Sequence, residues 1–87
     1  MSNNPVHSIR VGFNSIAIFK NTTQSGKVLY NAQMDRSYKD GDDWKRTHSF
    51  GLEDLCVQEE LIRRAKTWIF EQMQAGAEEH DELSAEL

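Results

Sequence analysis

The hydrophobic pattern of this chain changes its period once, near Leu52, and this change constrains the fold more than any other feature. Before Leu52, apolar and polar residues alternate, as they do in half-buried strands. After it, apolar residues recur every three or four positions, as on one side of an amphipathic helix. A length of 87 residues allows one small domain. We therefore expect an α+β fold, a three- or four-stranded antiparallel β-sheet followed by one C-terminal amphipathic α-helix.

The strand regions are separated by polar, glycine-containing segments. Residues 6–21 are rich in Val, Ile and Phe around Gly12, which predicts two short strands or one bent strand with a bulge. Residues 21–27 (NTTQSGK) are typical of a loop in which Gly26 supplies a positive φ. Residues 28–39 show the clearest alternation, residues 40–43 (DGDD) form a turn by composition, and residues 44–50 alternate again.

The pairing of the last two predicted strands follows from which side chains share a face. We expect the aromatic side chains of both strands to lie together, which requires an even pairing sum. Tyr38 then pairs with Trp44, or Met34 pairs with Phe50. Both registers gather Arg36 and Arg46 on an aromatic face. Two interpretations of this cationic cluster are open: the aspartates of the turn neutralise it, or it is an anion-binding site.

The region after Leu52 predicts one amphipathic helix with a stop signal at Gly76. Its apolar side carries Val57, Leu61, Ile62, Ala65, Trp68, Ile69 and Met73. Phe70 lies outside that stripe, in line with Cys56 and Arg63 at seven-residue spacing. Such a second stripe favours a contact with a dimer mate or another partner, so we take Arg63 and Phe70 as candidate contact residues.

Charge is distributed unevenly along the chain. Residues 1–52 contain seven basic and four acidic residues, whereas residues 53–87 contain three basic and ten acidic ones. Five of those ten acids lie beyond residue 77, in a segment with few apolar groups. We therefore expect a sheet-plus-helix domain over residues 1–77 and a disordered acidic tail over residues 78–87. The local field of the basic front half, rather than the net charge of −4, decides whether phosphate is attracted.

The sequence shows no catalytic motif and no metal-ligand spacing. No two of the three histidines have a metal-ligand spacing, and we expect His48 to be a hydrogen-bonded interior side chain. Acidic neighbours disfavour a thiolate at Cys56. We expect no catalytic activity, cofactor or metal. The sequence shows neither a long apolar run nor a secretory signal, which predicts a cytoplasmic protein without a membrane span.

Binding has more support than catalysis. Aromatic rings interleaved with guanidinium groups are what single-stranded nucleic acid stacks and pairs against. If the helix packs on the aromatic face, those rings are core, and the opposite face with Asn31, Gln33, Lys39, Lys45, Thr47 and Ser49 is the open one. The candidate nucleic-acid-binding residues are Arg10, Arg36, Tyr38, Lys39, Trp44, Lys45 and Arg46.

Several short segments resemble a group of short uncharacterised bacterial proteins. They are Ile9-Arg10-Val11-Gly12, Ala17-Ile18-Phe19-Lys20-Asn21, Tyr30-Asn31, Arg36-Ser37-Tyr38-Lys39-Asp40-Gly41-Asp42 with Trp44-Lys45, Phe50, Asp54-Leu55, and Ala65 with Trp68-Ile69. In its order of strands and one helix, that group is similar to the single-stranded-DNA-binding domain of the positive-cofactor transcription coactivators and the Whirly proteins. The resemblance implies a dimer that binds single strands over a curved sheet.

These observations lead to two hypotheses. The first is a small non-enzymatic protein that binds single-stranded DNA or a similar nucleic acid, with a regulatory role, as a homodimer whose lone helix leaves part of the sheet for a partner. The second is a protein-interaction module or phage-type inhibitor whose acidic helix and tail engage a basic protein.

Overall fold

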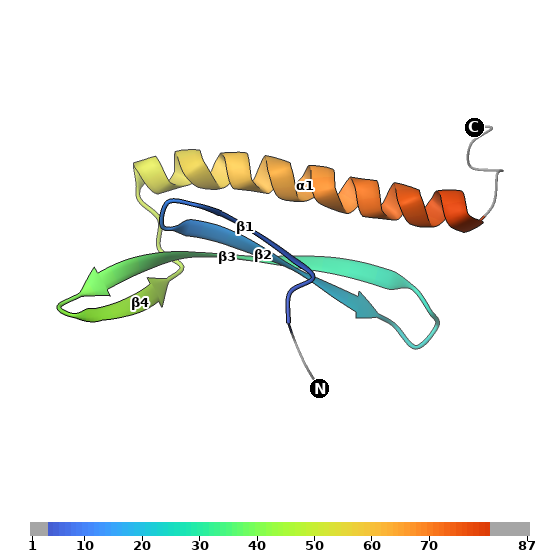
Figure 1. Cartoon of the computed structure of the whole chain (residues 1–87), viewed down its shortest axis with the longest axis horizontal. Coiled ribbons are helices and arrows are strands. Elements are labelled where there is room, and N and C mark those ends of the chain that lie inside the picture. The colour runs from blue at the N-terminus through green and yellow to red at the C-terminus, as the bar shows by residue number, and fades with distance from the viewer. Residues whose placement is uncertain (1–3, 81–87) are drawn as a thin grey trace.

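A computed structural model describes residues 4–80, for the last five of which it describes the backbone alone. Four strands precede one helix: β1 (His7–Val11), β2 (Asn14–Thr22), β3 (Val28–Asp40), β4 (Asp43–Thr47) and α1 (Leu52–His80). The strands form one antiparallel sheet in the order β1-β2-β3-β4, and α1 lies across one face of it (Figure 1). The predicted α+β architecture is confirmed. No helix among residues 4–80 has both the length and the apolar character needed to cross a membrane.

Two tight turns fix the register of the sheet. The β1–β2 turn contains only Gly12 and Phe13, and the β3–β4 turn contains only Gly41 and Asp42. In both turns the first residue is a glycine with positive φ, +62° and +65°, as in type II′ hairpin turns. A glycine adopts this backbone conformation without a steric penalty. Region 6–21 therefore forms two strands rather than one bent strand.

The β3–β4 register differs from the one we expected. Tyr38 pairs with Lys45 and Lys39 pairs with Trp44, because a two-residue turn sets Asp40 opposite Asp43. The pairing sum is odd, so Trp44 lies on the opposite face from Tyr38. The expectation that the aromatic and cationic residues of both strands share one face is therefore wrong.

The core lies between α1 and the first three strands. Its fully enclosed members are Ile16, Ile18, Leu61 and Ala65. Burial of one such Ile or Leu side chain stabilises the fold by about 1.5–3 kcal/mol. Trp68 extends this core toward the second half of α1, where its ring stacks on His7 at a centroid distance of 4.7 Å and meets Tyr30 edge-on at 6.0 Å.

Polar contacts fix the start of α1 against the sheet. The Asp54 carboxylate accepts a hydrogen bond from the Gly51 N–H at 3.0 Å, which satisfies a free donor at the helix start. It also accepts one from Asn14 Nδ2 at 3.0 Å and lies 3.1 Å from Arg36 Nε. The bond from Asn14, then the bond from Gly51 and the charge of Arg36, hold the Asp54 pKa below its usual range. Gln58 is buried one turn later and donates toward Asn14, Ser15 and Asp35.

Two element ends differ from the expected ones. β4 ends at Thr47, so residues 48–50 are not part of the strand predicted through Phe50. The helix continues past Gly76 to His80, and the predicted stop at Gly76 is therefore wrong. A glycine in a helix interior costs about 1 kcal/mol relative to alanine. A single cost of this size does not end a long helix. Of the predicted acidic tail, residues 81–87 lie outside the described residues.

Candidate nucleic-acid interface

The face of the sheet that points away from α1, here called the open face, carries an aromatic pair at one end. Phe13 comes from the β1–β2 turn and Trp44 from the start of β4. Their ring centroids are 5.5 Å apart with a tilt of 32°. Phe13 is 55% exposed and Trp44 is 58% exposed, so both rings offer surface to solvent.

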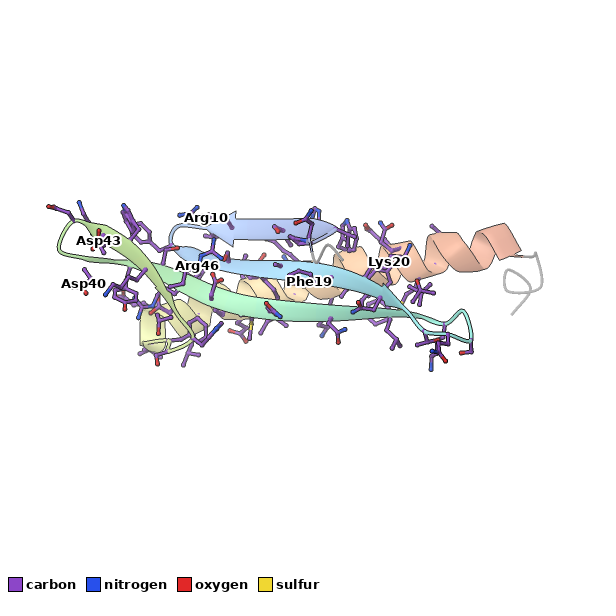
Figure 2. All side chains as sticks on the ribbon, turned by 90° about the horizontal axis from the view of Figure 1, so that it is seen from below. Arg10, Phe19, Lys20, Asp40, Asp43 and Arg46 are labelled. Atoms are coloured by element: carbon purple, nitrogen blue, oxygen red, sulfur yellow. The ribbon has the colours of Figure 1, made fainter. Side chains whose placement is uncertain are left out.

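Two arginines flank this aromatic pair. Arg10 is near the end of β1 and its Nε donates to the Gly12 carbonyl at 3.0 Å, while Arg46 follows Trp44 by two residues on β4. Figure 2 views the open face, and both side chains lie on it in the half that carries the β3–β4 hairpin. A depression of about 380 Å³ lies between these groups. It is lined by Arg10, Phe13, Ser37, Trp44, Lys45 and Arg46.

One carboxylate interrupts the positive charge of this region. Asp35 Oδ2 lies 3.3 Å from Arg46 Nη1, and Asp35 Oδ1 accepts a hydrogen bond from Ser15 Oγ at 2.6 Å. The Arg46 side chain nevertheless remains largely exposed. An exposed ion pair of this kind contributes about 0–1 kcal/mol, so an anionic ligand can replace Asp35 as the partner of Arg46 at low cost.

The other half of the open face is less charged and mixes amide with apolar side chains. Asn21, Asn31 and Gln33 surround Phe19 there, and with Ala32 they line a second depression of about 570 Å³. Side-chain amides provide both hydrogen-bond donors and acceptors, which suits base edges and sugar hydroxyls. The open face thus combines a cationic aromatic end with an amide-rich end.

The structure separates the predicted site residues into two groups. Arg10, Lys39, Trp44 and Arg46 lie on the open face, whereas Arg36, Tyr38 and Lys45 belong by register to the face that α1 partly covers. Arg36 donates to the Ser49 carbonyl at 3.3 Å besides pairing with Asp54. Lys45 pairs with Asp40 at 2.9 Å, although part of Lys45 also lines the first depression. The Arg36–Arg46 cluster that we expected is therefore not formed.

Sequence reasoning missed two groups near this interface. Phe13 lies in a region whose apolar composition predicts strands, and its place directly after Gly12 is the signal in the sequence for a turn. The buried Asn14–Gln58 contact was also missed. Gln58 precedes Leu61 by three residues and Ala65 by seven, which puts it on the buried side of the helix. Gln58 Oε1 is buried and has no hydrogen-bond partner among residues 4–80.

The candidate contact residues on α1 are exposed. Phe70 lies on the outer side of the helix, and Arg63 lies on the same side beside Glu60. Hydrogen bonds from Arg63 and then Arg64, supported by their charges, lower the Glu60 pKa to about 2. The acidic character of the helix is thus partly neutralised at its middle.

His48 and Cys56 both have exposed side chains. His48 is exposed rather than interior, and its Nδ1 lies 2.8 Å from the Met34 carbonyl, because the residues after Thr47 leave the sheet. Cys56 is an exposed thiol on α1. Within residues 4–80, no group of three or more His, Cys, Asp or Glu side chains is arranged to hold a metal ion.

Comparison with known proteins adds no relative to this description. No family model, no curated protein and no solved structure matches the chain.

Proposed function

We propose that this protein binds single-stranded nucleic acid on the open face of its sheet and has no catalytic role. The observation that carries the proposal is the group formed by Arg10, Phe13, Trp44 and Arg46 around one depression. Single-strand binders combine aromatic platforms for bases with cationic groups that follow the phosphates. Both elements are present at this end of the sheet.

The exposed rings support stacking rather than core packing. Trp44 belongs by register to the face opposite α1, so the helix cannot bury it. Stacking of a base on an aromatic side chain contributes about 1–3 kcal/mol and tolerates any base, because every base has a π-face. The site therefore favours binding with little sequence preference.

The guanidinium groups support phosphate binding. Arg10 and Arg46 flank the aromatic pair, and Lys39 pairs with Trp44 across the two strands. By register these three cations share this half of the open face with Asp35, whereas Asp40 and Asp43 belong to the other face of the same hairpin. The side chains of this half of the open face therefore carry more positive than negative charge, although Asp40, Asp42 and Asp43 lie at the adjacent turn and the whole chain carries a net charge of −4.

The test is fluorescence anisotropy with a labelled oligothymidylate of about 16 nucleotides, the upper end of the footprint of a small single-strand-binding domain. We expect Trp44→Ala to weaken binding about tenfold, in line with the loss of one stacked base. Arg46→Ala should weaken binding and flatten the plot of log affinity against log salt by about 0.7, the change expected for one lost phosphate contact.

Matched controls come from α1. Phe70→Ala removes an exposed aromatic ring, and Arg64→Ala removes one positive charge, both away from the open face. Neither change should alter affinity. Equal losses from the α1 variants and the open-face variants, or no oligonucleotide binding by the wild type at low salt, would contradict the proposal.

The competing function, in which the acidic helix and tail engage a basic protein, makes the opposite prediction for this series. It requires the acids of α1 and of residues 78–87 rather than the open face. Under that function, Glu53→Gln and Glu59→Gln reduce partner binding while Trp44→Ala has no effect.

A further inference from the structure

β3 extends well beyond the strand that covers its outer edge. It runs from Val28 to Asp40, but β4 pairs only with its residues 36–40. Residues 28–35 pair with β2 on one side, and no strand among residues 4–80 pairs with them on the other. Figure 1 shows this half of β3 running past β4 toward the β2–β3 loop.

The backbone groups of this free edge can be assigned from two contacts. The Ser37 N–H donates to the Phe13 carbonyl, toward β2, whereas the Met34 carbonyl points the other way, to His48 Nδ1. Backbone polar groups alternate in direction along a strand. Val28, Tyr30 and Ala32 therefore direct their N–H and C=O groups to the free edge.

The sequence of this edge lacks the usual protection against strand pairing. Soluble proteins place charged residues or proline on exposed edge strands to prevent association. Residues 28–34 (VLYNAQM) contain neither. The segment is bounded by Lys27 at one end and Asp35 at the other.

An apolar flank of α1 overhangs the same edge. Gln58 Nε2 lies 3.3 Å from the Asp35 carbonyl, so this side of the helix lies above β3. Ile62 and Ile69 follow Gln58 by four and eleven residues and therefore lie on the same side. Ile62 is 40% exposed there. Below this flank, Tyr30 and Met34 are only half-buried and Ala32 is exposed.

We propose that a second copy of this chain pairs with the free edge, antiparallel, β3 against β3, with a two-fold axis through Asn31. In this register Tyr30 faces Ala32 of the other copy, and Val28 faces its Met34, whose carbonyl exchanges its contact with His48 Nδ1 for one with the Val28 N–H. A second copy is the occupant that the sequence favours, because antiparallel self-pairing places the uncharged segment against itself and Lys27 opposite Asp35. Opposite charges that face each other across two strands are favourable.

The arrangement joins two sheets into one and goes beyond the proposed function. A two-fold axis perpendicular to the sheet keeps both helices on one side and both open faces on the other. The exposed side chains of Ile62 and Val28 become covered at the junction. The Arg10–Trp44 ends of the two copies lie far from the axis, so the pairing does not need their residues.

Cysteine cross-linking tests the register directly, in a Cys56→Ser background. Asn31 is expected to face Asn31 of the other copy as a non-hydrogen-bonded pair with Cα atoms about 4.5 Å apart, within the roughly 4.4–6.8 Å that a disulfide spans. Asn31→Cys should therefore form a covalent dimer under mild oxidation. The matched control Gln33→Cys lies on the same face, but its two copies are about 13 Å apart. It should stay uncross-linked, and equal cross-linking of both variants or of neither would overturn the proposal.

Sedimentation of two Ala32 variants gives a second measurement. Ala32→Pro removes an N–H that points to the free edge. An unpaired edge strand tolerates the loss of such an N–H. We expect this variant to be monomeric with an unchanged helical circular dichroism signal, and Ala32→Val, which keeps the N–H, to remain dimeric. A monomeric wild type at about 100 μM, far above the nanomolar to micromolar range of stable dimers, or a dimeric Ala32→Pro, would overturn the inference. Neither readout involves nucleic acid, so the result is independent of the proposed function.

Discussion

Replacement of Leu61 by alanine should remove most of the stability that joins α1 to the sheet. Leu61 has 0% exposure, as does Ile18, and it packs in the cluster with Ile16 and Ile18. The change deletes three carbon atoms. At about 0.8 kcal/mol for each buried methylene, the transfer contribution is about 2.4 kcal/mol, and the residual cavity raises the expected loss to about 3 kcal/mol.

This loss is large because the core is small. A domain of this size has an unfolding free energy of about 5–10 kcal/mol, and among the side chains that the structure describes only four apolar ones are fully enclosed. The assay is urea unfolding followed by circular dichroism at one fixed protein concentration. With a slope of about 1.5 kcal/mol per molar, the midpoint should fall by about 2 M.

The control is a second Leu→Ala change on the same helix. Leu52 is 79% exposed, so Leu52→Ala should alter the unfolding free energy by less than about 0.5 kcal/mol. Similar losses at Leu52 and Leu61, or a loss below about 1 kcal/mol at Leu61, would refute the conclusion that this cluster holds the helix on the sheet.

Two further predictions concern acid stability and the tight turns. The Glu60 pKa is lowered from 4.5 to about 2, so the stability that this carboxylate contributes is fully present above pH 4.5 and is lost as the pH falls toward 2. Glu60→Gln should remove that part of the pH dependence in acid titrations followed by circular dichroism. An unchanged titration would contradict the role of the Arg63 and Arg64 contacts. Gly41→Ala should destabilise the fold by about 1–2 kcal/mol because φ is +65° there. The control Gly51→Ala should change thermal stability little, because an added Cβ meets only Asp54 Oδ2 at 3.6 Å. Equal effects of the two changes would argue against turn strain.

The order of elements could be predicted because each element has a strong period of its own. The alternation over residues 28–39 became β3, and the helical stripe around Leu61 and Ala65 became the buried side of α1. These signals depend on local sequence alone. The positive φ of Gly26 in the second loop was predicted for the same reason, from turn chemistry.

The composition of the candidate site could not be predicted because it depends on one turn length. The segment DGDD offers several turn residues, and a loop of two or of three residues places Trp44 on opposite faces of the sheet. A shared aromatic face predicts the other register, but the glycine-led two-residue turn determines the pairing. As a result, Trp44 and Arg46 lie with Arg10 on the open face, and Arg36 lies with Asp54 beneath α1.

The buried amide of Gln58 has a consequence for how uniquely the helix is seated. An apolar stripe alone specifies the position of a helix along its axis only weakly. The helix can shift along a sheet by one turn, about 5.4 Å, and still cover Ile or Val side chains. The Gln58 amide fixes the position of the helix along its axis, because its N–H groups reach the carbonyls of both Ser15 and Asp35 at only one such position. A leucine at position 58 would retain the bulk and lose this discrimination, leaving a molecule that is folded but heterogeneous in the placement of its helix.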